Sequence, residues 1–153
     1  PMDEQAQLLF VHSAATLIYC ATMCHSTTNC QIFDFDGQSH RCRAFEGNVE
    51  TMGSIVASSS LQSRVGFIKL LPNHFIDRGK ACSYCQGSHY LVCINNSCQC
   101  PPNTYFDGSI CQSQRVLGGS CNIDTDCRID QNYTCLPRQQ CGRKYSAFVR
   151  RLP

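Results

Sequence analysis

The first half of the chain contains short apolar runs with the periods of strands and of one helix. Residues 7–11 form an apolar run that predicts a strand. Between residues 14 and 25, apolar side chains recur at spacings of three and four. The members of this period are Ala14, Leu17, Ile18, Ala21 and Cys24. The period predicts a helix over residues 14–25, with Ser13 as its N-cap.

Strands are predicted after the helix as well. Residues 31–35 alternate between polar and apolar side chains, which is typical of a strand. The following Asp36-Gly37 pair is a hairpin signal, so residues 40–45 are predicted as the return strand. A late strand is predicted over residues 64–70.

The 14 cysteines divide the chain in two. Four lie in the first 42 residues, none lies between residues 43 and 81, and ten crowd into residues 82–141. The first part therefore needs a hydrophobic core of its own, whereas the second depends on its bridges. An even set at a cysteine content of about 9 % is typical of an oxidising compartment, so we expect a secreted, extracellular protein.

Charge and hydropathy exclude several classes of protein. The 13 Lys and Arg against 11 Asp and Glu give a net charge of +2, without a basic block. Such a chain is a poor candidate for binding nucleic acid or an anionic membrane. No run approaches the roughly 18 apolar residues of a membrane span. The first residue is Pro1 and no secretory signal is visible, so we expect a processed form or a fragment.

Disulfide pairing in the first half is constrained by the helix. Cys20 and Cys24 would lie one turn apart on one face, where their side chains do not converge as a disulfide requires. A bond between Cys24 and Cys30 would close the chain just after the helix. A bond between Cys20 and Cys42 would tie the helix to the hairpin, and closing this loop would stabilise the fold by roughly 3 kcal/mol. The crossed pairing, Cys20 with Cys30 and Cys24 with Cys42, remains open on spacing alone.

This part of the chain resembles the core of a PAN/apple domain over roughly residues 5–71. The residues that carry the resemblance are Cys20, Cys24, Cys30, Phe33, Phe35 and Cys42. The resemblance implies a helix cradled by a curved antiparallel sheet, with bridges Cys20–Cys42 and Cys24–Cys30. Apple domains have a further bridge between their first and last strands, for which this chain has no cysteine. Known PAN domains bind proteins or carbohydrates, and the resemblance implies the same activity here.

The ten later cysteines repeat their spacing after about forty residues, which suggests duplicated small modules. The first set resembles an EGF-like module, and the second resembles the EB-type modules of invertebrate secreted proteins. The second set lacks a Cys-x-Cys and is truncated relative to the EGF-like pattern. The bridges that this pattern implies are Cys82–Cys93, Cys85–Cys98, Cys100–Cys111, Cys121–Cys135 and Cys127–Cys141.

Together these patterns predict an α+β PAN/apple-like domain, a helix on a curved antiparallel sheet, followed by small disulfide-rich β modules. The predicted order is a PAN/apple-like domain at 1–71, a short connection at 72–81, an EGF-like module at 82–111, a second EGF/EB-like module at 112–141 and an extended tail at 142–153.

No residue pattern points to catalysis or to a cofactor. Cys82-x2-Cys85 with Cys98-x-Cys100 has a ligand type that zinc prefers, but an even set of bridged cysteines is the simpler interpretation. None of the five histidines lies in a nucleophile or His-Glu-x-x-His motif. We therefore expect a non-enzymatic protein without catalytic residues, metal or cofactor.

Two N-glycosylation sequons begin at Asn95 and Asn132. Each lies in a loop bounded by cysteines, where a surface position is expected. We therefore expect N-linked glycans at these two asparagines.

Two terminal segments are candidates for contacts between copies of the chain. Their apolar residues are Leu8, Leu9, Phe10, Val11, Tyr145, Phe148, Val149 and Leu152. An extended apolar segment can add to an exposed sheet edge, and head-to-tail contacts generate open filaments. We therefore favour an extracellular structural or adhesive protein that self-associates, as a subunit of a glycosylated filament.

Two alternatives remain for the function. One is a monomeric module that binds an extracellular protein or a glycan, with an exposed aromatic surface. The candidates for that surface are Tyr84, Tyr90, Tyr105 and Phe106. The other is a disulfide-framed protease inhibitor, for which residues 112–119 are the candidate loop.

Overall fold

The computed structural model of this chain describes residues 7–48 and 61–143. The chain forms two compact units, Pro1–Ser113 and Gln114–Pro153, and each is described by itself. The first unit contains the predicted PAN/apple-like domain together with the first cysteine-rich module. The second unit contains the remaining cysteines.

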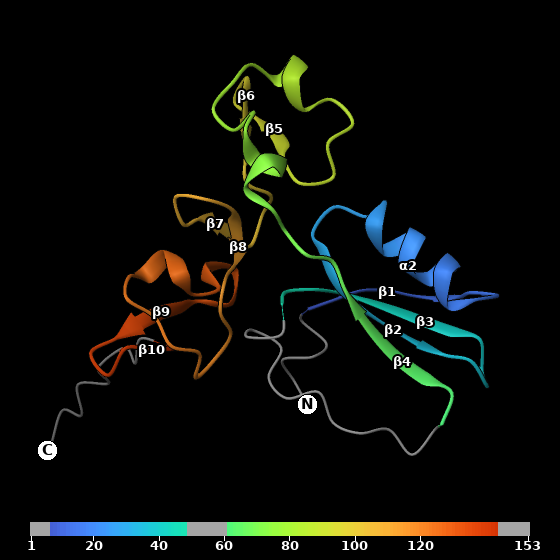
Figure 1. Cartoon of the computed structure of the whole chain (residues 1–153). Coiled ribbons are helices and arrows are strands. Elements are labelled where there is room, and N and C mark those ends of the chain that lie inside the picture. Colours follow the sequence, from blue (N-terminus) through green and yellow to red (C-terminus); the bar gives the residue numbers. More distant parts are fainter. Residues whose placement is uncertain (1–6, 49–60, 144–153) are drawn as a thin grey trace, which may run out of the picture. The chain divides into compact units, whose positions relative to one another are not determined.

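The first unit begins with a four-stranded antiparallel sheet. Its strands are β1 (Leu8–Ser13), β2 (Cys30–Asp36), β3 (Arg41–Glu46) and β4 (Ser63–Phe67). They lie in the order β1-β3-β2-β4, so β1 and β4 form the two edges. The helix α2 (Leu17–His25) lies over one face of this sheet (Figure 1). The predicted α+β arrangement is therefore confirmed for this part of the chain.

The predicted helix is present but begins later than its period suggested. Thr16 is the N-cap, and its hydroxyl accepts a hydrogen bond from the N–H of Tyr19 at 3.1 Å. The prediction of Ser13 as the cap is wrong, because Ser13 is still in β1 and pairs with Arg41. The next amide, that of Ala14, bonds to the carbonyl of the hairpin residue His40 at 2.8 Å. Pairing of β1 with β3 therefore keeps the chain extended through Ser13, where the apolar period predicted the start of the helix.

The core of this domain lies between α2 and the sheet. Phe33 of β2 pairs with Ala44 of β3, and Phe35 pairs with Cys42, so these side chains share one face of the sheet. The buried members of this core are Ala14, Cys20, Cys24, Cys30, Phe33, Phe35, Cys42 and Ala44. Half of them are cysteines, so bridges and apolar packing occupy the same space.

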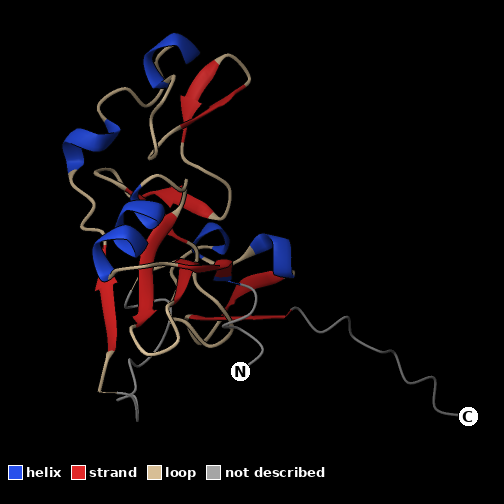
Figure 2. Cartoon of the chain, turned by 90° about the vertical axis from the view of Figure 1, so that its right-hand side faces the viewer, coloured by secondary structure: helices blue, strands red, loops and turns tan. Residues whose placement is uncertain are grey.

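Residues 72–113 contain little regular structure (Figure 2). Their elements are η1 (Pro72–Phe75), η2 (Cys82–Cys85), β5 (Val92–Ile94), β6 (Ser97–Gln99), β7 (Thr104–Phe106) and β8 (Cys111–Ser113). The strands form two short hairpins, β5–β6 and β7–β8. Phe75 and Leu91 are the buried apolar side chains around which the cysteines of this segment gather.

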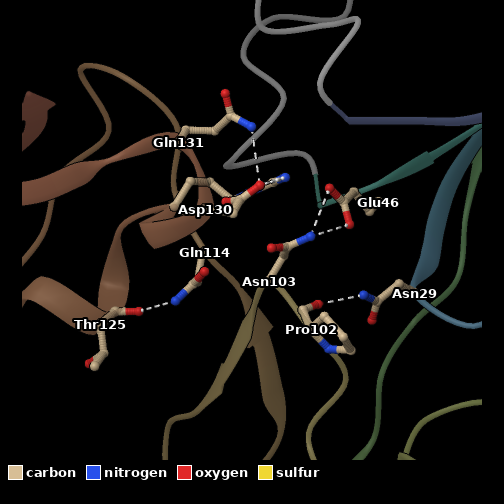
Figure 3. A network of polar contacts seen from close by, with 9 residues as sticks. Asn29, Glu46, Pro102, Asn103, Gln114, Thr125, Asp130 and Gln131 are labelled. Atoms are coloured by element: carbon tan, nitrogen blue, oxygen red, sulfur yellow. Dashed lines mark hydrogen bonds and ion pairs between the residues drawn. The ribbon is translucent and has the colours of Figure 1, made fainter.

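Side-chain hydrogen bonds join the four-stranded domain to the module that follows it within the first unit (Figure 3). The amide Nδ2 of Asn29 donates to the carbonyl of Pro102 at 2.7 Å. The amide of Asn103 donates to the carboxylate of Glu46, with a shortest distance of 3.3 Å. These contacts explain why the two predicted domains form one compact unit.

The second unit is a small module with one hairpin. Its elements are η3 (Asp124–Asp126), η4 (Ile129–Gln131), β9 (Tyr133–Leu136) and β10 (Gln140–Arg143). Its core is the ring of Tyr133 with Cys121, Cys127 and Cys141. A core of this size cannot hold a module of this length, so the bridges are essential to it.

All 14 cysteines are in disulfides, and none is free. The pairs are Cys20–Cys42, Cys24–Cys30, Cys82–Cys93, Cys85–Cys98, Cys100–Cys111, Cys121–Cys135 and Cys127–Cys141. These are the partners that the family resemblances imply. The crossed pairing of the first four cysteines does not form.

Candidate binding surfaces

The edge strand β1 contains four of the residues proposed for self-association. Leu8, Leu9 and Phe10 are half-buried, and Val11 is 48 % exposed. Among the described residues, β1 pairs only with β3. A bulge interrupts the register between Leu8 and Phe10, and the pairing is regular from there to Ser13. The regular part of β1 therefore presents an edge to which a further strand can be added.

The other proposed contact residues lie outside the described part of the chain. They are Tyr145, Phe148, Val149 and Leu152. The self-association of their segment therefore remains a prediction from the sequence.

The first turn of α2 exposes three consecutive apolar side chains. Ile18 is 78 % exposed, Tyr19 55 % and Leu17 38 %. Cys20 and Cys24 set the buried face of the helix, which leaves these residues on other faces. No Asp, Glu, Lys or Arg occurs between Glu4 and Asp34. The first turn of this helix is therefore apolar and uncharged, which is typical of the centre of a protein interface.

The sequence pattern does not predict this exposed surface. The apolar period included Leu17 and Ile18, which suggested a buried stripe. The positions of Cys20 and Cys24 indicate the buried face of the helix better than the apolar period does. Both cysteines are bridged to strand residues, so their side chains must point to the sheet. Ile18 and Tyr19 are two and one residues before Cys20, so they project away from that face.

The face of the sheet opposite α2 has charges at its centre. The guanidinium of Arg43 in β3 binds both carboxylate oxygens of Asp34 in β2, with Nε to Oδ1 at 3.0 Å. Arg43 also lies over the ring of Phe45, 5.6 Å from its centroid. Val11 of β1 and Val65 of β4 flank the pair on this face, because their register partners are Arg43 and Asp34. The face combines one ion pair with exposed apolar edges.

Most aromatic residues of the first cysteine-rich module pack within their own unit. Tyr90 stacks on the imidazole of His74, with ring centroids 4.2 Å apart. The guanidinium of Arg78 covers the ring of Phe106 at 3.8 Å. Tyr84 is 61 % exposed. Of the aromatic candidates for a recognition surface, Tyr84 is therefore the most accessible, and Tyr90 and Phe106 are half-buried.

Two of the five histidines, His25 and His74, contact the same ring, that of Tyr90. His12 packs against Phe10 with ring centroids 4.9 Å apart, and His25 lies 5.7 Å from His89. The cysteines considered as alternative zinc ligands are all bridged, and a disulfide sulfur is not the thiolate that zinc requires.

The two sequons differ in their surroundings. Asn95 lies in the two-residue turn of the β5–β6 hairpin and is exposed, with φ of 50°. Asn132 is exposed and has φ of 58°. Its sequon hydroxyl, that of Thr134, donates to the carboxylate of Asp124. Both asparagines have the surface positions that the sequence analysis predicted.

The acidic residues of the second unit hold its turns. Asp126 is buried and accepts hydrogen bonds from the amides of Asn122 and Ile123. Asp130 accepts two hydrogen bonds of 2.7 Å from the buried guanidinium of Arg128. These bonds outweigh partial burial and hold the pKa of Asp130 below its ordinary value. The carboxylates are therefore engaged by the chain itself.

The segment considered as an inhibitor loop is not an exposed loop. Residues up to Ser113 pair in β8, and Gln114 is buried, with its amide bonded to the carbonyl of Thr125 at 2.9 Å (Figure 3). The backbone of Arg115 pairs with Asp126 and Arg128. Of residues 112–119, only Leu117 and Gly118 are fully exposed.

Comparison with known proteins assigns the first part of the chain. Residues 5–69 match the PAN domain family, over less than half of the chain. No curated protein and no solved structure matches the chain. The EGF-like and EB-type modules therefore stay predictions.

The described residues contain no helix long and apolar enough to cross a membrane. PAN domains commonly mediate protein or carbohydrate binding in extracellular proteins. The seven disulfides indicate the same oxidising location. Residues 5–69 of this chain therefore form a PAN domain, in a disulfide-rich protein of extracellular type.

Proposed function

We propose that this protein is a non-enzymatic, extracellular structural or adhesive subunit that self-associates head to tail through its termini. The observation that supports this proposal is the position of β1 at the edge of the PAN sheet. The backbone N–H and C=O groups on the outer side of an edge strand are available to another extended chain. The apolar exposed side chain of Val11 adds a contact beside these groups.

The occupant that we propose for this edge is the tail of another copy. Residues 145–153 are apolar and basic, and they follow the last cysteine, so no bridge constrains them. When a peptide adds as a strand to a sheet edge, main-chain hydrogen bonds provide the affinity. Every second side chain of the added strand contacts the sheet and provides the specificity. A contact between the tail of one copy and a different surface of the next copy is heterologous. Copies joined in this way form an open filament when the rotation between neighbouring copies does not close a ring. N-linked glycans at Asn95 and Asn132 would lie on the surface of such a filament.

The experiment compares two charged substitutions on opposite edges of the same sheet. Val11 and Val65 are 48 % and 45 % exposed, and both lie on edge strands. Val11→Lys places a charge beside the proposed edge, and Val65→Lys places the same charge beside the other edge. We expect Val11→Lys and deletion of 145–153 to reduce assemblies to monomers, while Val65→Lys assembles normally. Sedimentation velocity and negative-stain electron microscopy measure the size.

Two results would contradict the proposal. A wild-type protein that stays a monomer of 17.1 kDa plus glycan at high concentration does not self-associate. Assemblies that persist without residues 145–153 would show that the tail is not the contact. Circular dichroism of each variant checks that the fold is intact.

A second candidate function is recognition of another extracellular molecule by a monomer. It is favoured by the uncharged first turn of α2, where Ile18 and Tyr19 are exposed. A glycan array and immobilised matrix proteins are suitable probes. Binding that is lost in Ile18→Asp, but retained in Thr22→Asp one turn further along the helix, would support this function. The protease inhibitor is the weaker alternative, since its candidate loop is partly buried.

A further inference from the structure

The four cysteine residues of the second unit differ in their exposure to solvent. Its two disulfides are Cys121–Cys135 and Cys127–Cys141. Cys121, Cys127 and Cys141 are buried, with exposed fractions of 4 %, 0 % and 2 %. Cys135 is only half-buried. Of the four, Cys135 is therefore the residue most exposed to a thiol from solution.

The three buried sulfurs converge although they belong to two different bridges. The Sγ atoms of Cys121, Cys127 and Cys141 all lie within 4.8 Å of one another. Cleavage at Cys135 would leave the sulfur of Cys121 beside an intact disulfide. Thiol–disulfide exchange requires a thiolate next to a disulfide sulfur, and this arrangement provides both.

The hairpin supplies the last partner. Cys135 of β9 and Cys141 of β10 are directly opposite each other in the register. The Cβ atoms of opposite residues in an antiparallel pair lie about 4.5–5.5 Å apart. A small adjustment brings them to the separation that a disulfide needs. A second pairing, Cys121–Cys127 with Cys135–Cys141, is therefore within reach of the same backbone.

We propose that Cys135 is a thiol-accepting site, at which a low-molecular-weight thiol catalyses exchange of these two disulfides. The thiolate attacks Cys135 Sγ, forms a mixed disulfide there and releases the Cys121 thiolate. Cys121 attacks Cys127, forms the Cys121–Cys127 bond and releases the Cys141 thiolate. Cys141 then attacks Cys135, forms the Cys135–Cys141 bond and expels the original thiolate. Two disulfides are present at the start and at the end, so no net oxidant or reductant is consumed.

The exchange changes what the bridges connect. In the observed pairing, both disulfides tie the β9–β10 hairpin to the segment that carries Cys121 and Cys127. In the exchanged pairing, one disulfide lies within that segment and the other within the hairpin. No disulfide would then join the hairpin to η3, and hydrogen bonds such as those that Thr134 and Cys135 donate to Asp124 would hold the two together. The buried ring of Tyr133 would become exposed whenever these bonds open.

The first module offers an internal comparison. Its bridges Cys82–Cys93 and Cys85–Cys98 also end on opposite hairpin residues, Cys93 and Cys98. Among the described residues, however, only the cysteines of the second unit form a cluster of three close sulfurs. Exchange should therefore be confined to the second unit.

The test treats the full oxidised chain with a catalytic amount of reduced glutathione at pH 8, where the thiolate is populated. The reaction is quenched with N-ethylmaleimide and digested with trypsin. The sites after Arg115, Arg128, Arg138 and Arg143 yield peptides 116–128, 129–138 and 139–143. In the observed pairing all three peptides are joined. In the exchanged pairing, 116–128 carries an internal bridge, and 129–138 is joined to 139–143.

We expect the internally bridged peptide 116–128 to accumulate only in samples treated with glutathione. Mass spectrometry that finds only the three-peptide assembly and fully reduced peptides, at every time point, would overturn the proposal. Digestion with Asp-N before Asp124 and Asp126 separates Cys121 from Cys127. This digest distinguishes the original bonds from the pairing Cys121–Cys141 with Cys127–Cys135, since both pairings join all three tryptic peptides. Detection of the pairing Cys121–Cys141 with Cys127–Cys135 would also overturn the proposed route.

A pair of variants tests the route without added thiol. Cys135→Ser leaves Cys121 free next to Cys127–Cys141, so the alkylation label should divide between Cys121 and Cys141. Cys93→Ser leaves Cys82 free in the first module, where the label should remain on Cys82. A label confined to Cys121 in Cys135→Ser would contradict the exchange. The experiment on the wild-type chain stands even if either variant fails to fold.

Discussion

Gly66 of β4 lies directly opposite Phe33 of β2, so close that a Cβ atom at position 66 would overlap the phenylalanine ring. The ring of Phe33 is buried in the core beneath α2. Any side chain at position 66 would therefore displace the ring or separate the edge strand from the sheet.

Gly66→Ala should destabilise the PAN domain by about 1–3 kcal/mol, since it overpacks a closed core. Urea unfolding measures this change. The matched control is Gly37→Ala, whose Cβ would meet mainly the flexible Gln62 side chain at 3.2 Å, and which should change stability by less than about 0.5 kcal/mol. Phe33→Leu should restore part of the loss in the Gly66→Ala background. Equal effects of the two alanine substitutions would contradict this account.

The two bridges of the PAN domain should differ in their contribution to stability. Cys20–Cys42 spans 22 residues of sequence and Cys24–Cys30 spans 6. From the entropy of loop closure, the first should contribute about 3 kcal/mol and the second about 2 kcal/mol. The double variants Cys20→Ala/Cys42→Ala and Cys24→Ala/Cys30→Ala make the comparison in urea. A larger loss for the second pair would show that local strain or packing outweighs loop closure.

The ion pair between Arg128 and Asp130 should make the second unit sensitive to acid. The hydrogen bonds from Arg128 lower the pKa of Asp130 in the folded chain, so the bond stabilises the fold above the ordinary aspartate pKa. That contribution is lost as the pH falls through the folded pKa. Asp130→Asn should cost about 1 kcal/mol at neutral pH, since the Asp130 side chain is 39 % exposed. Urea unfolding between pH 7 and pH 2 should show the two proteins converging in acid, and a constant gap would contradict the assignment.

Asn95 should carry a glycan when the chain is secreted from eukaryotic cells. It is exposed and lies in a two-residue turn, a surface position suited to an oligosaccharide. Asn95→Gln should lower the intact mass by one glycan. Asn96→Gln, in the same turn, keeps the sequon and should retain the sugar. An unchanged mass in Asn95→Gln would show that the site is not used, and Asn132→Gln tests the second sequon in the same way.

Much of the PAN domain could be predicted from local patterns. The helix, the hairpin around Asp36 and Gly37 and the late strand all appear close to their predicted ranges, because short-range periodicity and turn preference determine them. Helix geometry rules out a disulfide between Cys20 and Cys24, which leaves two possible pairings of the first four cysteines. The choice between two pairings depended on the family resemblance, since spacing along the chain does not show which strands meet.

Other features were decided by tertiary structure alone. Thr16 rather than Ser13 caps the helix because β3 extends β1 by pairing, and pairing is a contact between residues far apart in sequence. The exposed turn at Ile18 and Tyr19 follows from bridges that rotate the cysteine face of α2 toward the sheet. The close sulfurs of Cys121, Cys127 and Cys141 arise only when the chain folds back on itself.

The sequence by itself therefore determined the class of protein, its even set of bridged cysteines and the elements of its first domain. These follow from composition and from interactions within a few residues. The tertiary structure decided which strands form the edges, which apolar residues face solvent and which sulfurs lie together. Those properties depend on packing between distant segments, which no local pattern encodes.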